Sequence, residues 1–253
     1  MKKIVKSILL VLIVLSSTFL AQTAEMDNDS KKIYNEGNKL RKSGDYAGAI
    51  AKYDEALKLT SDYRVYYNKS VTLKKLRKYD EAEAALLSCI ENKKDFSSAY
   101  NALGGIYFAN GQYSEAIEQF EKFKQYSDQD KHKEKADQYI AQAYTKLALK
   151  EKSDNKYPKA VEYLLKAVDH AKFDKAYLAL AEVYIDMQKW DEALEAGDKA
   201  LNYRKKISKG GPNYFKGMAF KGKGDNVKAK ECFLAGKNDK TYGQNCKYEL
   251  ESL

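Results

Sequence analysis

The sequence predicts an all-α protein built as an α-solenoid, a stack of helix-turn-helix repeats, and three observations support this prediction. Residues 100–123, YNALGGIYFANGQYSEAIEQFEKF, carry apolar residues at helical spacing on both sides of a glycine-containing turn. Similar segments recur along the chain. Only two prolines and 32% charged residues fit a helical, solvated protein. Because a lone helical hairpin cannot bury its apolar faces, each hairpin needs its neighbours.

Each repeat is marked by an alanine early in its second helix, usually after an aromatic residue and an acid. These alanines follow one another at spacings of 33, 34, 44, 33 and 36 residues, which is typical of a tandem array of helical hairpins. The alanines are Ala49, Ala82, Ala116, Ala160, Ala193 and Ala229.

The residues around these alanines resemble the tetratricopeptide repeat, a motif of 34 residues with a small residue at position 8 and an aromatic residue at position 24. Position 8 is small in every repeat and reads Gly37, Ser70, Gly104, Ala148, Ala181 and Gly217. Position 24 reads Tyr53, Leu86, Phe120, Leu164, Gly197 and Phe233. The family's proline at position 32 is missing from this chain. The resemblance covers residues 31–253 and implies a right-handed superhelix of about six repeats.

The resemblance also sets the repeat boundaries. The repeats are expected at residues 30–62, 63–96, 97–130, 131–173, 174–207 and 210–240, and a C-terminal helix at 240–253 is expected to cap the last of them. A loop, ISKGGPN at 207–213, leads into the sixth repeat.

The 44-residue spacing between Ala116 and Ala160 marks one irregular repeat. We expect its extra residues to lengthen the first helix, rather than to enlarge the SDNK turn before Tyr157, because the usual step back from Ala160 reaches the small Ala148. Pro158 is compatible with the array, since proline in the first turn of a helix loses no hydrogen bond.

The first 21 residues have the layout of a secretory signal peptide. They begin with MKK and continue with an unbroken apolar run from Ile8 to Leu15. Residues 22–30 then form a polar linker, in which Asp29 or Ser30 can cap the first helix. We therefore expect a periplasmic or secreted protein. The alternative is an uncleaved segment that anchors the protein in the inner membrane, although the apolar run is shorter than the ~20 residues of a spanning helix.

The sequence contains no motif for catalysis, a cofactor or a metal. It has no GxSxG, HExxH or phosphate-binding loop, and its two histidines, His132 and His170, have no partner at ligand spacing. The three cysteines, Cys89, Cys232 and Cys246, form no CxxC pair. Cys232 and Cys246 could meet and form a disulfide in an oxidising compartment, or stay as free thiols. We expect a non-enzymatic protein without cofactor.

The basic charge does not indicate a nucleic-acid partner. Three of the lysines behind the formal charge of +9 lie in the predicted signal peptide, and the rest form no recognisable nucleic-acid-reading motif. We expect a protein or peptide partner, no nucleic acid, and membrane contact only if the N-terminal segment is uncleaved. The partner's identity and self-association do not follow from the sequence.

The resemblance implies that the first helices line a concave groove that binds an extended segment of another protein. The family's groove positions fall on Lys31, Tyr34, Asn38, Arg41, Arg64, Tyr67, Asn68, Lys74, Asn101 and Phe108. Asparagines can pair with peptide amides and bases with carboxylates, so we expect an acidic or polar segment. The carboxylate clamp of the family's chaperone adaptors is matched only at Asn38 and Asn68, and we do not expect it here. The predicted function is an adaptor or assembly scaffold, and the alternative is a membrane-anchored accessory subunit.

Overall fold

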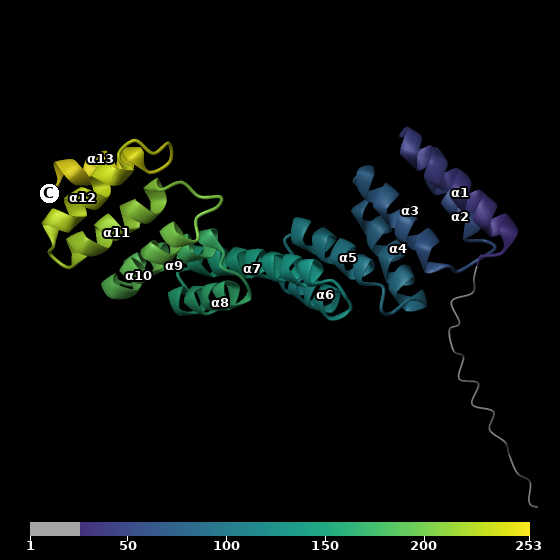
Figure 1. The fold of residues 1–253 in the computed structure, drawn as a ribbon, viewed down its shortest axis with the longest axis horizontal. Helices are drawn as coiled ribbons and strands as arrows, with labels where there is room; N and C mark the ends of the chain where they lie inside the picture. Colours follow the sequence, from purple (N-terminus) through teal and green to yellow (C-terminus); the bar gives the residue numbers. More distant parts are fainter. Residues whose placement is uncertain (1–25) are drawn as a thin grey trace, which may run out of the picture.

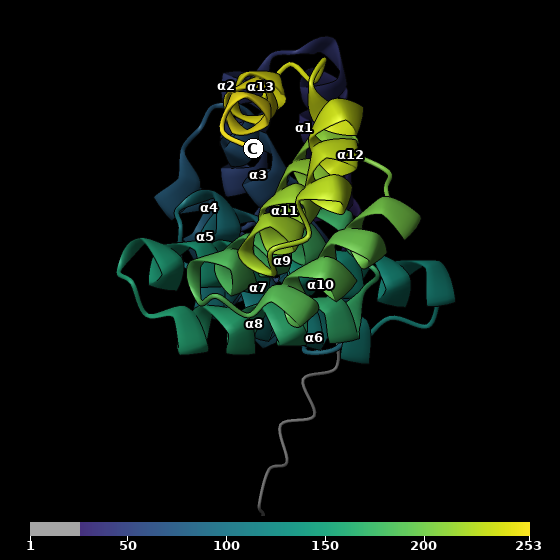
Figure 2. The same cartoon turned by 90° about the vertical axis from the view of Figure 1, so that its left-hand side faces the viewer.

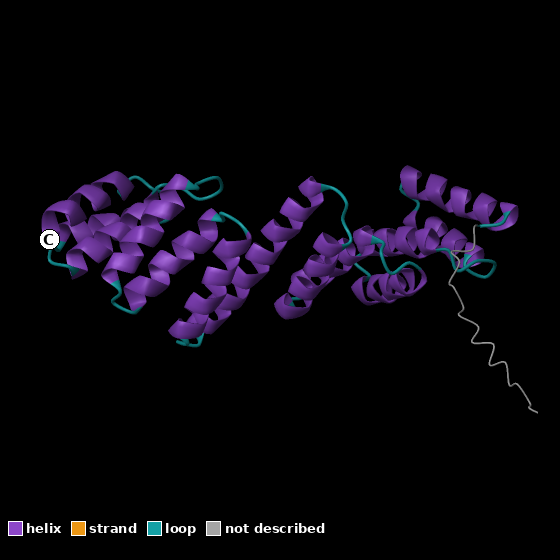
Figure 3. Cartoon of the chain, turned by 60° about the horizontal axis from the view of Figure 1, so that its bottom comes forward, coloured by secondary structure: helices purple, strands orange, loops and turns teal. Residues whose placement is uncertain are grey.

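The structure, a computed structural model, describes residues 26–253, and every regular element in that range is a helix (Figure 3). This confirms the prediction of an α-solenoid. The helices are α1 (Asn28–Ser43), α2 (Tyr46–Ala56), α3 (Tyr63–Lys75), α4 (Tyr79–Asn92), α5 (Ser97–Ala109), α6 (Tyr113–Gln125), α7 (Asp130–Ser153), α8 (Tyr157–His170), α9 (Asp174–Asp186), α10 (Trp190–Asn202), α11 (Gly210–Gly222), α12 (Asn226–Gly236) and α13 (Gly243–Glu251).

The helices are stacked in pairs along an elongated array. Each odd-numbered helix from α1 to α11 packs against the even-numbered helix that follows it, and α13 packs on α12 and α11 at the C-terminal end. The two ends of the array rise on the same side of the middle repeats (Figure 1). Seen along the array, successive pairs are rotated relative to one another (Figure 2). The array is therefore curved, as a tetratricopeptide-like superhelix requires.

The two helices of a repeat cross closely where the first helix has a glycine and the second has a ring. A Cβ atom added to Gly37 would lie 2.8 Å from Cε1 of Tyr53. One added to Gly104 would lie 2.7 Å from Cε1 of Phe120. Gly217 stands in the same relation to Phe233. The missing side chain at position 8 thus makes the space that the aromatic ring at position 24 fills.

The other three repeats have different residues at these two positions. Their first helices carry a small side chain in place of glycine, and their second helices carry no ring at position 24. The residues at positions 8 and 24 are Ser70 and Leu86, Ala148 and Leu164, and Ala181 and Gly197. Gly197 instead allows close approach of the next repeat, since a Cβ added to it would lie 2.6 Å from Cγ of Lys216 on α11.

The alanines that define the repeat period are also explained by packing. All six are completely buried at the start of the second helices. A larger side chain there would force the helices apart, and overpacking of this kind is destabilising.

The start of α1 differs from the expectation. The helix begins at Asn28, and its cap is Asp27, whose Oδ1 accepts a hydrogen bond from the backbone N–H of Ser30 at 2.7 Å. The prediction that Asp29 or Ser30 caps the helix was wrong, because Asp27 already satisfies a free N–H of the first turn. The predicted signal peptide and residues 22–25 of the linker lie outside the described residues.

The irregular repeat has the predicted form. Helix α7 has 24 residues, about twice the length of α5 or α9, and it accommodates the extra residues without an enlarged turn. Pro158 lies in the first turn of α8.

Helix α11 begins at Gly210, where the sixth repeat was expected to start, so the loop before it ends sooner than the predicted 207–213. Gly210 and Gly211 are buried against Asp239 and Tyr242. The start of the C-terminal helix was misplaced. Helix α13 begins at Gly243, three residues later than expected. The Asp239 carboxylate accepts hydrogen bonds from the N–H groups of Thr241 and Tyr242, and these hold residues 239–242 in a turn.

The three cysteines are free thiols in this structure, and Cys89 and Cys246 are buried. Burial raises the pKa of Cys89 to about 12 and that of Cys246 to about 11. Such thiols behave as small apolar residues of the core.

Substitutions of two adjacent glycines in α5 test whether the helix crossing depends on the missing side chain at position 8. Gly104→Ala should lower the free energy of unfolding by about 1–3 kcal/mol, because the new methyl group collides with the buried Phe120 ring. Gly105→Ala is the control: its Cβ would meet only the flexible end of Lys74 at 3.5 Å, and alanine favours the helix by up to about 1 kcal/mol. Urea unfolding followed by circular dichroism gives both values. Equal effects of the two substitutions would contradict this account of the crossing.

Candidate functional site

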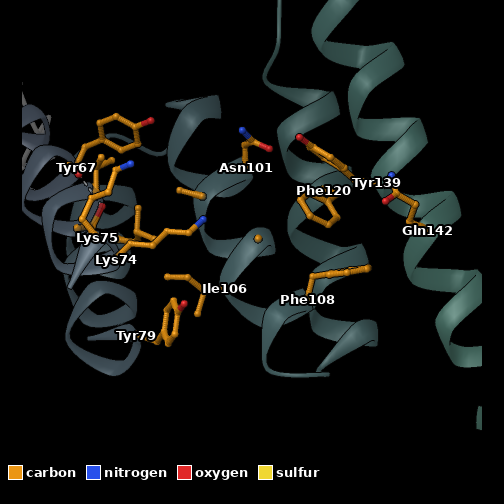
Figure 4. A pocket seen from close by; sticks show the side chains of 15 residues that line it. Tyr67, Lys74, Lys75, Tyr79, Asn101, Ile106, Phe108, Phe120, Tyr139 and Gln142 are labelled. Carbon is orange, nitrogen blue, oxygen red and sulfur yellow. Dashed lines mark hydrogen bonds between the residues drawn. The ribbon is translucent and has the colours of Figure 1, made fainter. Parts of the chain in front are cut away.

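Two connected cavities run along the first helices of the middle repeats. The α3–α7 cavity has a volume of about 610 Å³ and lies among α3, α5 and α7 (Figure 4). The α7–α9 cavity has a volume of about 370 Å³ and lies between α7 and α9. Phe108 and Gln142 line both. The two cavities therefore adjoin each other at these side chains, and together they are called here the groove.

A separate depression, the α1–α3 hollow, lies at the N-terminal end of the array. It has a volume of about 520 Å³. Its lining residues are Tyr34, Asn35, Asn38, Lys39, Arg41, Lys42 and Asn68.

Helical periodicity places the groove residues. Tyr67, Val71 and Lys74 are spaced by four and three residues in α3 and share one face of that helix. The same spacing puts Asn101, Gly105 and Phe108 on one face of α5. Each first helix thus presents a single stripe to the groove, while its opposite side packs against the second helix of its repeat.

The side chain of Lys74 reaches from α3 to Gly105 on α5. The Nζ atom of Lys74 lies 3.5 Å from the place where a Cβ of Gly105 would be. Lys74 extends from α3 toward α5, and the Tyr139 and Gln142 side chains of α7 lie on the far side of α5 (Figure 4). The α3–α7 cavity therefore combines an ammonium group with amide and phenol groups from other helices.

The charges of the groove and the hollow are almost all positive. The basic residues that line them are Lys39, Arg41, Lys42, Lys74, Lys75, Lys146 and Lys175. Within residues 26–253 none of these makes an ion pair. The single acidic lining residue is Glu182, and its carboxylate is bound by Lys152 at 2.6 Å. The unneutralised positive charge therefore attracts anionic groups.

The structure brings eight of the ten predicted site residues to these depressions. Four line the α1–α3 hollow: Tyr34, Asn38, Arg41 and Asn68. Four line the α3–α7 cavity: Tyr67, Lys74, Asn101 and Phe108. Their role in binding stays a prediction.

Lys31 and Arg64 line none of the depressions. Lys31 is exposed at the start of α1. The guanidinium of Arg64 binds the buried carboxylate of Asp62 through Nε at 2.9 Å and Nη2 at 2.6 Å. This ion pair raises the pKa of Arg64 and holds its charge at the start of α3. Arg64 therefore has no free charge to offer a ligand.

The two asparagines of the hollow are partly engaged within the protein. The Tyr53 hydroxyl donates to Oδ1 of Asn38 at 2.8 Å, and Nδ2 of Asn68 donates to the Tyr34 hydroxyl at 2.5 Å. An amide has both donors and an acceptor, so Nδ2 of Asn38 and Oδ1 of Asn68 stay open to a ligand. The buried Nε of Arg41 also has no hydrogen-bond partner among the described residues.

Several groove residues were not among the predicted ones. Gln142, Lys146 and Lys175 occupy the same repeat positions that gave the predicted residues in repeats one to three, and extending that register would have found them. Tyr139 lies in the extra length of α7, where the repeat register gives no guidance. Phe173 and Ile207 lie in loops, and nothing in the sequence marks them as groove residues.

A buried carboxylate fixes the loop that contributes Ile207 to the groove. Asp174 is 2% exposed and accepts hydrogen bonds from the backbone N–H groups of Lys205 at 2.7 Å, Lys206 at 2.5 Å and Ile207 at 3.1 Å. Burial alone would raise the pKa of Asp174, but these N–H groups outweigh it and the pKa is lowered. The same hydrogen bonds hold Ile207 against the α7–α9 cavity.

The described residues contain no cluster of three or more histidine, cysteine or acidic side chains that could hold a metal ion. In the same range, no helix combines the length and the apolar character needed to span a bilayer.

Sequence comparison finds repeat proteins. The family profile described as tetratricopeptide repeat matches residues 34–88, 67–130 and 145–212. Small glutamine-rich tetratricopeptide repeat-containing protein 2 of Mycosarcoma maydis is 36% identical over 90 residues, which are 34% of this chain and 25% of that protein. DnaJ homolog subfamily C member 7 of Homo sapiens is 30% identical over 104 residues, which are 39% of this chain and 21% of that protein. The chain spans about a quarter or less of the length of these two relatives.

Structure comparison finds the same fold. The crystal structure of YrrB, described as a TPR protein with an unusual peptide-binding site, has a TM-score of 0.51 at 19% identity, covering 78% of this chain and 97% of that one. The structure of pilF of Pseudomonas aeruginosa has a TM-score of 0.50 at 15% identity, covering 87% of this chain and 97% of that one. Identities this low establish the fold alone.

The substitution Asp174→Asn tests whether the ionised carboxylate of Asp174 stabilises the protein by holding the loop at residues 205–207. The substitution should lower the free energy of unfolding by about 1.5–3 kcal/mol, because a neutral amide replaces a charged acceptor of several hydrogen bonds. The folded-state pKa lies below the unfolded value of about 3.9, so the stabilisation is fully present above that value and disappears as the pH falls through the folded pKa. Urea unfolding of the wild type and the variant at several pH values from 7 to 3 measures this difference in the free energy of unfolding.

The exposed Asp128→Asn is the matched control and should change the free energy of unfolding by less than about 0.5 kcal/mol. A difference between wild type and Asp174→Asn that stays constant down to pH 3 would contradict the assignment of the stabilisation to the ionised carboxylate.

Proposed function

Given that this chain belongs to the tetratricopeptide repeat family, we propose that it is a non-catalytic adaptor or assembly scaffold that holds a segment of another protein in the groove. Proteins of this family are generally interaction modules. The proposal adds that the segment is acidic, that the protein works outside the cytoplasm, and that it catalyses no reaction.

The main support for the proposal is that the lysines of the groove are not paired with acidic residues in the described part of the chain. On the outer surfaces of the helices many lysines are neutralised by neighbours, as Lys122 is by Glu118 at 2.7 Å and Lys166 by Glu162 at 2.7 Å. Lys74 and Lys75 line the groove without such a partner among residues 26–253. A ligand carboxylate therefore gains an ion pair without breaking an existing one.

The polar and apolar groups of the groove suit a peptide backbone. Asn101 and Gln142 offer amides that can donate to and accept from a main chain, and Tyr67 and Tyr139 add apolar rings with polar tips. Such a lining favours an extended segment, whose main-chain groups are free, over a folded surface. YrrB, whose structure is described as having a peptide-binding site, is a precedent on the same fold.

Export is the second part of the proposal. Its support is the N-terminal sequence alone, with a basic start, a short apolar run and a polar stretch after Ala21. The alternative, a membrane-anchored accessory subunit, needs the apolar run to stay uncleaved.

The N-terminus of the mature protein decides between these two alternatives. We expect Edman sequencing or intact-mass measurement of the natively expressed protein to give a start near Gln22, because a signal peptidase cuts after a small residue that follows the apolar run. A chain that keeps Met1 and sediments with membranes would support the anchored alternative instead.

Charge reversal tests whether the lysines of the groove bind the partner. The double variant Lys74→Glu with Lys75→Glu should weaken capture of the partner by at least about tenfold at low salt, because each reversal replaces an attraction by a repulsion. The control is Lys58→Glu with Lys94→Glu, which changes the net charge equally at exposed positions outside the groove. Chemical cross-linking of the exported protein followed by mass spectrometry measures the capture, and circular dichroism verifies the helicity.

The predicted loss should shrink as salt is raised, since exposed charges are screened. Arg64 is left out of this variant because its reversal would break the ion pair with Asp62. Equal capture by the two double variants would move the binding site away from the groove.

A further inference from the structure

We infer that the α7–α9 cavity is an anchor pocket, and that the segment held in the groove is acidic and carries one bulky apolar side chain, aromatic or leucine, that enters this pocket. The inference rests on the proposed function and makes its ligand specific.

The α7–α9 cavity is the smaller of the two cavities of the groove, and five of its lining side chains are large and apolar. These side chains are Phe108, Leu149, Phe173, Leu178 and Ile207. Leu149 is 39% exposed there, although it lies within a long, well-packed helix. A cavity of about 370 Å³ is in the size range of ligand sites and has room for one large side chain. Filling it would remove these walls from water, which the hydrophobic effect favours.

The pocket is held in place before any ligand arrives. Ile207 is fixed through the Asp174 hydrogen bonds. Leu178 packs against α11, since a Cβ added to Gly211 would lie 3.0 Å from its Cδ1 atom. The Thr145 hydroxyl donates to the backbone oxygen of Ala141 at 2.7 Å and so turns its polar atom away from the pocket. A preformed pocket costs little ordering on binding.

The positive charges beside this pocket favour a ligand that has acidic residues next to its inserted apolar residue. Lys146 and Lys175 are exposed on α7 and α9, and no acid within residues 26–253 pairs with them. Glu182 does not neutralise them, because Lys152 binds its carboxylate. Carboxylates on either side of an inserted apolar side chain would meet these two ammonium groups.

The apolar hollows outside the groove lack this combination. The hollow at the C-terminal end, with Val227 and Leu234, has both Lys230 and Glu231 in its lining. The hollow beside Leu165 is lined by two glutamates and one lysine. Neither has a charge bias that would select a ligand. Within the groove, the α3–α7 cavity also combines apolar side chains with unpaired lysines, but its volume is about 610 Å³ against about 370 Å³, so the α7–α9 cavity is the closer fit to a single side chain.

The spacing of the ligand's groups follows from the repeat. First helices of neighbouring repeats lie at least about 8–10 Å apart, so the step from Lys74 on α3 to the pocket beyond α7 is roughly 20–25 Å. At about 3.3 Å per extended residue, that distance corresponds to about seven residues. The ligand is therefore expected to carry a second acidic cluster about seven residues from its anchor.

Fluorescence anisotropy with synthetic peptides tests the inference. The probe is a fluorescein-labelled peptide with four glutamates, a serine-glycine spacer of six residues, and a phenylalanine flanked by glutamates. The matched peptide has alanine in place of phenylalanine. Wild-type protein should bind the phenylalanine peptide at least about tenfold more tightly, as burial of the ring predicts.

The pocket variant is Leu149→Ala, which removes a partly exposed wall and should reduce that preference to about threefold or less. Its control is Leu87→Ala, a leucine on α4 that is 48% exposed outside the groove, and it should keep the full preference. Circular dichroism verifies that both variants are folded. A preference that Leu149→Ala leaves intact would overturn the inference.

The remaining outcomes separate the two proposals. Equal binding of both peptides, lost in the Lys74→Glu and Lys75→Glu variant, would overturn the anchor pocket and leave the groove function standing. No binding of either peptide would overturn both. If sedimentation shows a dimer that Leu149→Ala dissociates, a second copy of the chain occupies the pocket and the inference is wrong.

Discussion

The crossing between the two helices of a repeat is the contact on which the rest of this structure depends. In three repeats a glycine at position 8 lets the ring at position 24 lie directly against the first helix, as Gly104 and Phe120 do. The others have a small side chain at position 8 and a leucine or a glycine at position 24. Because one side of each first helix packs against the second helix of its repeat, the first helix has one stripe left over. Those stripes, aligned by stacking, become the groove.

The lysines of this protein are distributed between two electrostatic environments. On the outer faces, lysines and carboxylates spaced by three or four residues neutralise one another, as Lys199 and Glu195 do. Along the groove the first helices supply lysines without nearby acids. A modest net charge can therefore coexist with a strongly positive inner surface. Charge separated in this way acts on the rate and selectivity of partner capture more than on stability.

Helix α7 gives the groove its particular shape. Its extra length brings Tyr139 to the α3–α7 cavity. Its regular part supplies Gln142 to both cavities, and Thr145 and Leu149 to the α7–α9 cavity. The loop at residues 203–209, held by Asp174, adds Ile207 to the wall of the α7–α9 cavity. Amide groups suited to a main chain and a smaller cavity suited to one side chain thus lie next to each other along the groove.

The sequence by itself determined the fold and the register of the repeats. Helical periodicity, the recurring buried alanines and the small residues at position 8 act locally, between helices adjacent in the chain, so they are readable without coordinates. The same register located eight of the ten predicted residues at the depressions. Tertiary structure alone decided which of these groups are free: Arg64 is bound by Asp62, whereas Lys74 lies unpaired over Gly105. It also decided that loop residues Phe173 and Ile207 complete the α7–α9 cavity. The physical reason is that a cavity and an unpaired charge depend on atoms from helices far apart in sequence, whose distances no local pattern encodes.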